Sequence, residues 1–206
     1  MLRVGLTGGL ASGKSFVGRT LAEFGCHLIQ ADELGHQVLL PGGEAYDAVV
    51  REFGAGILDS EGLIVRKALA ALVFDKPERL AVLNSLVHPP VIRHEEEMVA
   101  RFRAEDPEGI AVVEAAILIE TGSYRRFHKV VLAVCEERQQ MERAMKRDGL
   151  ERERVLARLQ RQMPLAAKRK YADYVIDTSG SKEDTVRQTR ALFEQLRTVA
   201  LEYARV

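Results

Sequence analysis

The stretch Gly8-Gly-Leu-Ala-Ser-Gly-Lys-Ser15 (GGLASGKS, residues 8–15) decides the fold of this chain. It matches the pattern G-x-x-x-x-G-K-[ST] of a phosphate-binding loop, or P-loop, at every defined position. Glycines let backbone N–H groups turn toward phosphates without side-chain clashes. The lysine can reach the β- and γ-phosphates of a nucleotide, and the serine hydroxyl can coordinate Mg²⁺. We therefore expect ATP to bind Gly8, Gly9, Leu10, Ala11, Ser12, Gly13, Lys14 and Ser15.

The sequence on both sides of the loop has the pattern that a P-loop needs. Residues 2–7 (LRVGLT) are a short, mostly apolar run, typical of a buried strand. Residues 14–24 carry apolar side chains at helical spacing, and Gly25 ends that pattern. The loop thus joins a strand to a helix, whose positive dipole end favours phosphate. A chance match in a turn is the alternative, and it does not explain both flanks.

Four more apolar runs predict the remaining strands, at residues 26–29, 110–119, 130–135 and 174–176. Helical patterns separate these runs along the chain. Strands that alternate with helices predict parallel β-α-β units. The fold class is therefore α/β, with a doubly wound, mainly parallel five-stranded sheet of the P-loop NTPase type.

Two segments depart from this alternation. Residues 33–109 hold helical patterns punctuated by prolines, with little strand signal, and predict a helical subdomain set into the sheet. Residues 136–170 are highly charged and helical, broken by Gly149 and Pro164. A solvated helix pair is the simplest interpretation of that second segment. We expect residues 1–206 to form a single kinase domain that contains both.

Composition and charge exclude several classes of protein. The chain has 206 residues, of which 47% are hydrophobic and 29% charged, a balance typical of globular proteins. Thirty basic and thirty acidic residues cancel, which does not support wholesale nucleic-acid binding. No apolar run approaches the ~20 residues of a membrane span, and no signal peptide opens the chain, so we expect a cytoplasmic protein. Cys26 and Cys135 lack metal-binding spacing and are expected to be buried thiols.

The P-loop by itself does not define the reaction. GTPases usually carry an Asn-Lys-x-Asp element, whereas the one asparagine of this chain is Asn84, in Leu-Asn-Ser-Leu. Motor and transporter ATPases need large further modules, for which the chain has no room. A small-molecule kinase with ATP as co-substrate and Mg²⁺ as its metal is the class that remains. No pattern in the sequence indicates an oligomeric state.

Two acidic residues follow predicted strands. Asp32 comes after the second strand, at the sheet edge where the P-loop lies. Its carboxylate could accept the proton of an attacking hydroxyl or could cap a helix, and the residues leave both open. Glu114 ends a buried run, where P-loop enzymes place an acid that holds Mg²⁺ together with the loop serine, here Ser15. An ordinary strand-end carboxylate is the alternative for Glu114.

Arginine and histidine candidates are less specific. Arg143 and Arg147 are four residues apart, so they share a helical face and could together meet transferring phosphates. Most basic residues of this charged segment must nevertheless be solvated. His88 precedes Pro89 and Pro90. Since proline favours an extended preceding residue, we expect a rigid turn with a structural histidine there, and a helix that restarts at Pro90.

Taken in order, these segments resemble the signatures of the dephospho-CoA kinase family, over nearly the whole chain. The P-loop is specific by itself, whereas the other motifs are specific only together. The matching segments are Gly5-Leu-Thr-Gly-Gly-Leu-Ala-Ser-Gly-Lys-Ser15, Ala31-Asp32, Leu86-Val-His88-Pro89, Glu114-Ala-Ala-Ile-Leu-Ile-Glu120, Gln140-x-x-Arg143-x-x-x-Arg147-Asp-Gly, Arg158-x-x-x-Gln162-Met-Pro-x-x-x-Lys168, Ala172-Asp173 and Val175-Ile-Asp-x-Ser-Gly-Ser181.

The resemblance implies a core like that of nucleoside monophosphate kinases, a helical coenzyme A domain at 33–109 and a mobile lid at 136–170. The implied reaction is ATP-dependent phosphorylation of the ribose 3′-hydroxyl of dephospho-CoA, which gives CoA and ADP in the last step of coenzyme A biosynthesis. The resemblance makes Asp32 a catalytic base and His88 an acceptor-site residue. It adds Lys14, Arg143 and Arg147 as catalytic residues that meet phosphate, and Phe16, Thr178 and Gly180 as ATP-binding residues.

The chain departs from the family pattern at four positions. Gln30, Phe16, Ala116 and Thr178 stand where the family usually has Asp, Thr, Pro and Asn. Gln30 removes one carboxylate near the acceptor, and none of the four changes Lys14 or Ser15.

Two other functions stay open, a kinase of another small acceptor such as a nucleoside or a shikimate-like metabolite, and a non-catalytic ATP-binding protein. The insert with His88 argues against the first. Retention of Lys14, Ser15 and Asp32 argues against the second.

Overall fold

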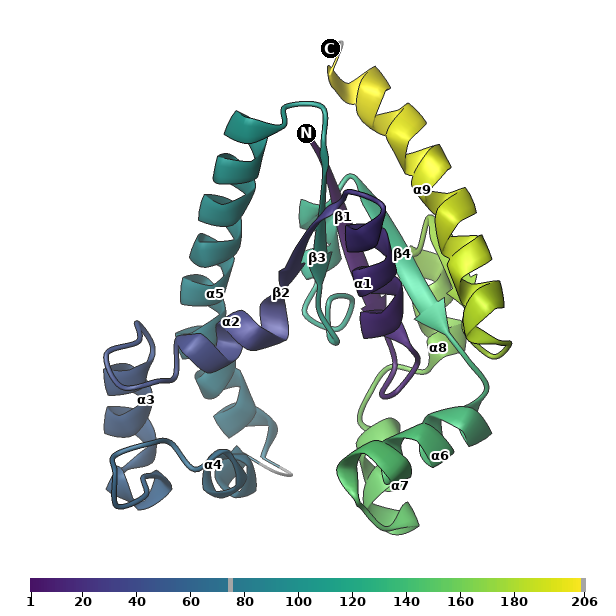
Figure 1. Cartoon of the computed structure of the whole chain (residues 1–206). Coiled ribbons are helices and arrows are strands. Elements are labelled where there is room, and N and C mark those ends of the chain that lie inside the picture. Colours follow the sequence, from purple (N-terminus) through teal and green to yellow (C-terminus); the bar gives the residue numbers. More distant parts are fainter. Residues whose placement is uncertain (74–75, 205–206) are drawn as a thin grey trace. The chain divides into compact units, whose positions relative to one another are not determined.

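A computed structural model of the chain describes residues 1–73 and 76–204 (Figure 1). The strands in these residues pair in parallel in the order β2-β3-β1-β4-β5, so β1 lies at the centre of the sheet. The predicted α/β fold with a five-stranded parallel sheet is therefore confirmed. The strands are β1 (Leu2–Gly8), β2 (His27–Gln30), β3 (Ile110–Glu114), β4 (Lys129–Val134) and β5 (Tyr174–Asp177).

Helices connect the strands, and the chain forms two compact units. The first unit, here called the core unit, is Met1–Gln30 with Val99–Val206, and the second, the helical unit, is Ala31–Met98. No helix in the described residues combines the length and apolar character of a membrane span. The helices are α1 (Lys14–Glu23), α2 (Ala31–Gln37), α3 (Tyr46–Phe53), α4 (Arg66–Val73), α5 (Pro77–Glu105), α6 (Glu137–Asp148), α7 (Arg152–Gln160), α8 (Leu165–Lys168) and α9 (Lys182–Ala204), with short 3₁₀ turns at Ala55–Ile57, Ser123–Arg126 and Arg169–Tyr171.

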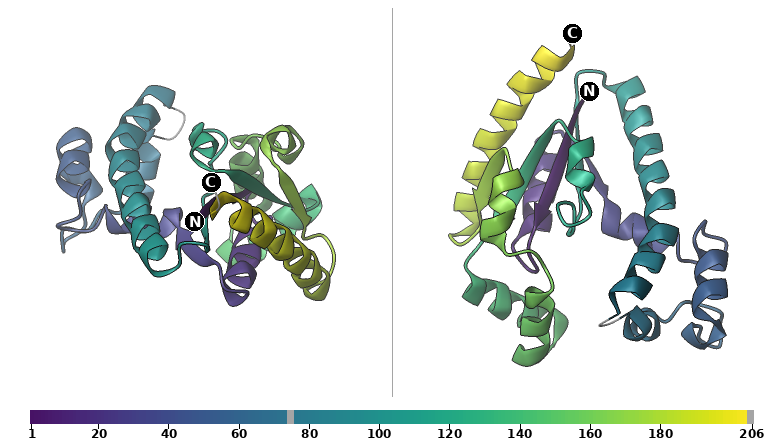
Figure 2. Two further views of the ribbon diagram at one scale, coloured as in Figure 1. Left: turned by 90° about the horizontal axis from the view of Figure 1, so that it is seen from above. Right: turned by 180° about the vertical axis from the view of Figure 1, so that it is seen from behind.

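The core of the first unit lies between the sheet and two helices. Figure 1 and both views of Figure 2 show α1 and α9 side by side along one face of the sheet. Alternate residues of β1 point to this face and pack against apolar residues of α1 and α9. Leu6 of β1 and Leu21 of α1 are completely buried, and each such side chain stabilises the fold by about 1.5–3 kcal/mol. The packing fixes the strand and the helix that the P-loop joins.

The opposite face of β1 is covered by the segment that follows β3. Gly5 points to this face, since strand side chains alternate. A Cβ atom at Gly5 would lie 2.7 Å from Leu118 and 2.9 Å from the ring of Phe127. The central strand therefore needs glycine here, because the covering side chains lie directly on its backbone.

Two predictions about element bounds were wrong. The strand predicted at 110–119 ends at Glu114, because Leu118 and Ile119 are buried by a turn against the sheet and not by strand pairing. An apolar run alone does not distinguish these two kinds of burial. The turn predicted at His88 is absent, since α5 continues through Pro89 and Pro90. The fixed φ of proline is compatible with a helix, so α5 continues although Pro89 and Pro90 supply no backbone N–H donors.

Gly5→Ala should lower the free energy of unfolding by about 1–3 kcal/mol, because the added methyl group overpacks Leu118 and Phe127. Gly35→Ala is the matched control, since a Cβ atom there meets no atom within 4 Å and alanine favours the surrounding helix. Urea denaturation of both variants measures the difference. Equal stability of the two variants would contradict the packing described for β1.

Candidate active site

The P-loop is a compact turn between β1 and α1 (Figure 1). Its shape requires Gly13, whose φ of +83° is left-handed and disfavours any residue with a Cβ atom. The amide of Ser12 donates to the carbonyl of Gly9 at 3.2 Å, and the amide of Phe16 donates to the carbonyl of Gly13 at 3.0 Å. The loop therefore delivers Lys14 and Ser15 as the first two residues of α1, where N–H groups of the helix lack partners within the helix.

Three predicted site residues meet at the ends of β1 and β3. The two strands are neighbours, with Leu6 paired to Glu114, so the carboxylate of Glu114 lies beside the start of the P-loop. The ammonium of Lys14 lies 2.6 Å from Oε1 of Glu114, and the hydroxyl of Ser15 donates to the same oxygen at 2.5 Å. Glu114 is 3% exposed and Lys14 and Ser15 are half-buried, so sequence positions 14, 15 and 114 form one polar cluster around a buried carboxylate.

One of the two carboxylate oxygens of Glu114 can still accept a ligand. A buried carboxylate is costly unless it is paired, and Lys14 and Ser15 satisfy Oε1. Oε2 of Glu114 is buried without a hydrogen-bond partner among the described residues. Carboxylate and hydroxyl oxygens are ligands that Mg²⁺ prefers, and Mg²⁺ usually binds through one or two protein groups with water and phosphate. The donor set of Ser15 and Glu114 thus fits a magnesium ion that arrives with a nucleotide.

No larger metal site is present in the part of the chain that the structure describes. No group of three or more His, Cys, Asp or Glu side chains there could hold a metal ion. A dedicated all-protein cage of carboxylates, histidines or thiolates is therefore absent from residues 1–73 and 76–204.

Thr178 and Arg143 come together behind the loop. The buried hydroxyl of Thr178, which follows β5, donates to the carbonyl of Ser12 at 2.8 Å. The guanidinium of Arg143 on α6 donates to that hydroxyl at 3.0 Å and to the carbonyl of Thr178 at 2.7 Å. A Cβ atom on Gly13 would lie 2.8 Å from the same hydroxyl. These two residues therefore support the backbone of the loop from the side of β5.

Arg147 lies one turn beyond Arg143 and has a different partner. Its guanidinium donates to the carboxylate of Asp148 at 2.7 and 3.1 Å, and Arg158 of α7 donates to the same carboxylate at 3.1 Å. Hydrogen bonding from Arg147 lowers the pKa of the Asp148 carboxyl. The side chain of Arg147 is 59% exposed, so this pair adds little stability. The two arginines expected to act together are thus held by separate partners.

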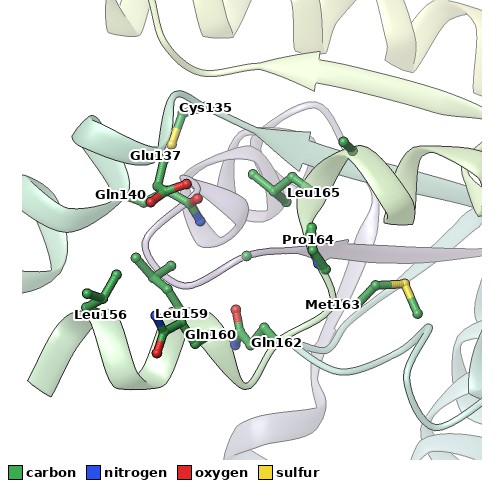
Figure 3. A pocket seen from close by; sticks show the side chains of 12 residues that line it. Cys135, Glu137, Gln140, Leu156, Leu159, Gln160, Gln162, Met163, Pro164 and Leu165 are labelled. Atoms are coloured by element: carbon green, nitrogen blue, oxygen red, sulfur yellow. The ribbon is translucent and has the colours of Figure 1, made fainter.

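Sequence reasoning missed two glutamines that hold Leu10. The side-chain amide of Gln140 on α6 donates to the carbonyl of Leu10 at 2.7 Å, and the amide N–H of Leu10 donates to Oε1 of Gln162 at 2.7 Å. Figure 3 shows both glutamines in the wall of a cavity of 570 Å³ between α6, α7 and the segment before α8. Their place in the family-like segments was the available signal, since a side-chain bond to a distant backbone leaves no local pattern.

Asp32 and His88 belong to the helical unit. Asp32 lies exposed in the first turn of α2, where its negative charge favours the helix dipole. His88 lies half-buried within α5, and burial lowers the pKa of its imidazole. Their assigned roles as base and acceptor-site residue stay predictions.

Thr178→Val should lower the free energy of unfolding by about 1–3 kcal/mol, because it keeps the shape of the side chain and removes the hydroxyl that joins Ser12 to Arg143. Thr198→Val is the matched control, since that exposed hydroxyl bonds only a carbonyl of its own helix. We expect a change within about 0.5 kcal/mol for the control. Urea denaturation checks both variants, and similar losses would mean that the Thr178 contacts do not support the loop.

Comparison with known proteins places this site in a family. The dephospho-CoA kinase family model matches residues 2–184. The dephospho-CoA kinase of Aquifex aeolicus is 40% identical over 95% of this chain and 98% of the relative. A Thermus thermophilus protein of known crystal structure has 35% identity and a TM-score of 0.80, covering 95% of this chain and 97% of that one. The dephospho-CoA kinase of Campylobacter jejuni has 25% identity and a TM-score of 0.69 over the same shares.

These matches include the P-loop, the strand that ends at Glu114 and the α6 segment with Arg143 and Arg147. Kinases of this kind transfer a phosphoryl group from ATP. The chain belongs to the dephospho-CoA kinase family.

Proposed function

We propose that this chain transfers the γ-phosphoryl group of ATP to the ribose 3′-hydroxyl of dephospho-CoA and releases CoA and ADP, the last step of coenzyme A biosynthesis. The cluster of Lys14, Ser15 and Glu114 carries the proposal, because it joins a phosphate-binding loop to a buried acid. The family match over residues 2–184 supports the choice of acceptor.

The nucleotide side of the reaction belongs to the core unit. Backbone N–H groups of residues 8–15 and the positive end of α1 bind the phosphates, and Lys14 pairs with the β- and γ-phosphates. Ser15 and Glu114 would hold Mg²⁺, which supplies positive charge to the phosphate oxygens when it is bound. Arg143 and Arg147 add positive charge from the lid segment at 136–170. Phe16, Thr178 and Gly180 are the further residues that we assign to the ATP site.

The acceptor side belongs to the helical unit. The 3′-hydroxyl oxygen attacks the γ-phosphorus, its proton goes to the carboxylate of Asp32, and the bond between γ-phosphorus and the bridging oxygen of ADP breaks. His88 contributes to binding of the acceptor. Gln30 ends β2 where the family usually has an acid, so in this chain Asp32 is the carboxylate of that segment that we assign to proton transfer. Phosphoryl transfer needs little more than this positioning and charge compensation.

An acceptor panel tests the proposed reaction. With ATP and Mg²⁺, we expect rapid ADP formation with dephospho-CoA. With a nucleoside or shikimate as acceptor, kcat/KM should be lower by a factor of about 10² or more.

Lys14→Ala should lower turnover with dephospho-CoA by orders of magnitude, because charged hydrogen bonds to phosphate are worth about 1.5–3 kcal/mol before transition-state effects.

Urea denaturation of the Lys14→Ala variant checks that it is folded. A preference for another acceptor would mean that the substrate is misassigned. Turnover of Lys14→Ala within threefold of the wild type would remove the P-loop from the mechanism, since that factor is under about 1 kcal/mol of barrier. ATP binding without any transfer would favour a non-catalytic protein.

Asp32→Asn tests the base. The change keeps the shape of the side chain and removes its charge. We therefore expect turnover to fall by a factor of about 10² or more, the scale of a positioned base. KM for ATP should stay within threefold, because the P-loop is unchanged. Glu33→Gln is the matched control, since it removes the same charge from the next exposed residue of α2, and it should keep wild-type turnover. Equal activity of the two variants would leave the mechanism without its base.

A further inference from the structure

Lys168 is a buried charged residue that the proposed mechanism does not use. It ends α8, and its side chain is 0% exposed. Its ammonium nitrogen lies 2.8 Å from Oε1 of Glu120, 3.1 Å from the carbonyl of Gly8 and 3.2 Å from the carbonyl of Ala116. An ammonium group has three N–H donors and no acceptor, so these three oxygens satisfy it completely.

Burial of a lysine needs a reason. Lysine is almost never fully buried unless it is paired, and removing its charge from water costs several kcal/mol even after relaxation. An apolar side chain of similar size would fill the same space without that cost. The contacts of Lys168 therefore point to what the charge holds in place.

The two carbonyl groups that Lys168 binds lie on the two segments that carry the cluster of Lys14, Ser15 and Glu114. Gly8 is the last residue of β1 and the first residue of the P-loop. Ala116 follows Glu114, the last residue of β3, by two positions. The hydroxyl of Thr7 also donates to the carbonyl of Ala116, at 3.3 Å. Lys168 thus joins the ends of β1 and β3 where the P-loop lysine and serine meet the buried carboxylate.

The same contacts fasten the segment after α7 to the loop. Oε1 of Glu120 accepts a hydrogen bond from the amide of Met163 at 3.2 Å as well as from Lys168. Gln162, the preceding residue, accepts the bond from the amide of Leu10. Residues 162–168 therefore hold the first part of the P-loop at two backbone positions, Gly8 and Leu10.

We propose that Lys168 is a positioning residue for phosphoryl transfer. Its ammonium group keeps the carbonyls of Gly8 and Ala116 at a fixed separation, and so keeps the P-loop and Glu114 in the arrangement that ATP and its metal require. It contacts none of the reacting groups. The proposal rests on the P-loop as the ATP site. A displacement of about 1 Å in such a site can lower the rate by 10²-fold, so a small relaxation is enough to be measured.

The test is the double variant Lys168→Met/Glu120→Gln, which removes both charges of the ion pair together. We expect kcat/KM for ATP to fall about 10- to 100-fold, while Kd for dephospho-CoA changes less than twofold. Glu120→Gln alone keeps the lysine on both carbonyls and should keep kcat/KM for ATP within threefold. Lys170→Met, a change of an exposed lysine two residues on, is the control for loss of a positive charge.

All rates are measured at a temperature where urea denaturation shows each variant to be folded. A double variant that is less stable but has wild-type kcat/KM for ATP would overturn the proposal, because Lys168 would then serve stability alone. Equal losses of affinity for ATP and dephospho-CoA would also overturn it, since they indicate general loosening. If Lys14→Ala is inactive while the double variant is fully active, the proposed function is supported and only the role of Lys168 is contradicted.

If the double variant does not fold, Lys168→Arg gives the second measurement. It keeps the positive charge and moves the N–H donors, so kcat/KM for ATP should fall at least fivefold in a folded protein. A wild-type value for this variant would overturn the proposal in the same way.

Discussion

The structure depends on one buried carboxylate. Glu114 lies at the end of a strand in the interior of the sheet, where an unpaired negative charge would be strongly destabilising. The ammonium of Lys14 and the hydroxyl of Ser15 make its burial possible. Because the P-loop supplies both partners, the charge of Glu114 also determines where the loop lies against β3. One interaction thereby links fold stability to the position of the residues that we assign to phosphate and metal.

Side chains that are distant in sequence from the P-loop hold its backbone in place. Lys168 binds the carbonyl of Gly8, Gln140 and Gln162 bind both backbone groups of Leu10, and Thr178 binds the carbonyl of Ser12. Backbone groups of every second loop residue, Gly8, Leu10 and Ser12, thus have side-chain partners from elsewhere in the chain. A loop fixed in advance loses little free energy when charge develops on a bound ligand.

The residues that we assign to the two substrates fall in different units of the chain. The groups assigned to ATP lie in the core unit, built on the parallel sheet and its covering helices α1 and α9. Asp32 and His88, assigned to the acceptor, lie in the helical unit. Asp32 is the second residue of α2 and lies two residues after Gln30, the end of β2, so the chain passes directly from the sheet edge to the proposed base.

The sequence alone determined the P-loop, the α/β class and the five parallel strands, because each has a local signature in residue type and spacing. The sequence predicted wrongly that the third strand runs to residue 119 and that the chain turns at His88. In both places, burial and helix continuity depend on packing against distant residues. The roles of Arg143, Gln140, Gln162 and Lys168 were decided only by the tertiary structure. Each of these side chains binds backbone groups more than thirty residues away, and such partners leave no trace in the neighbouring sequence.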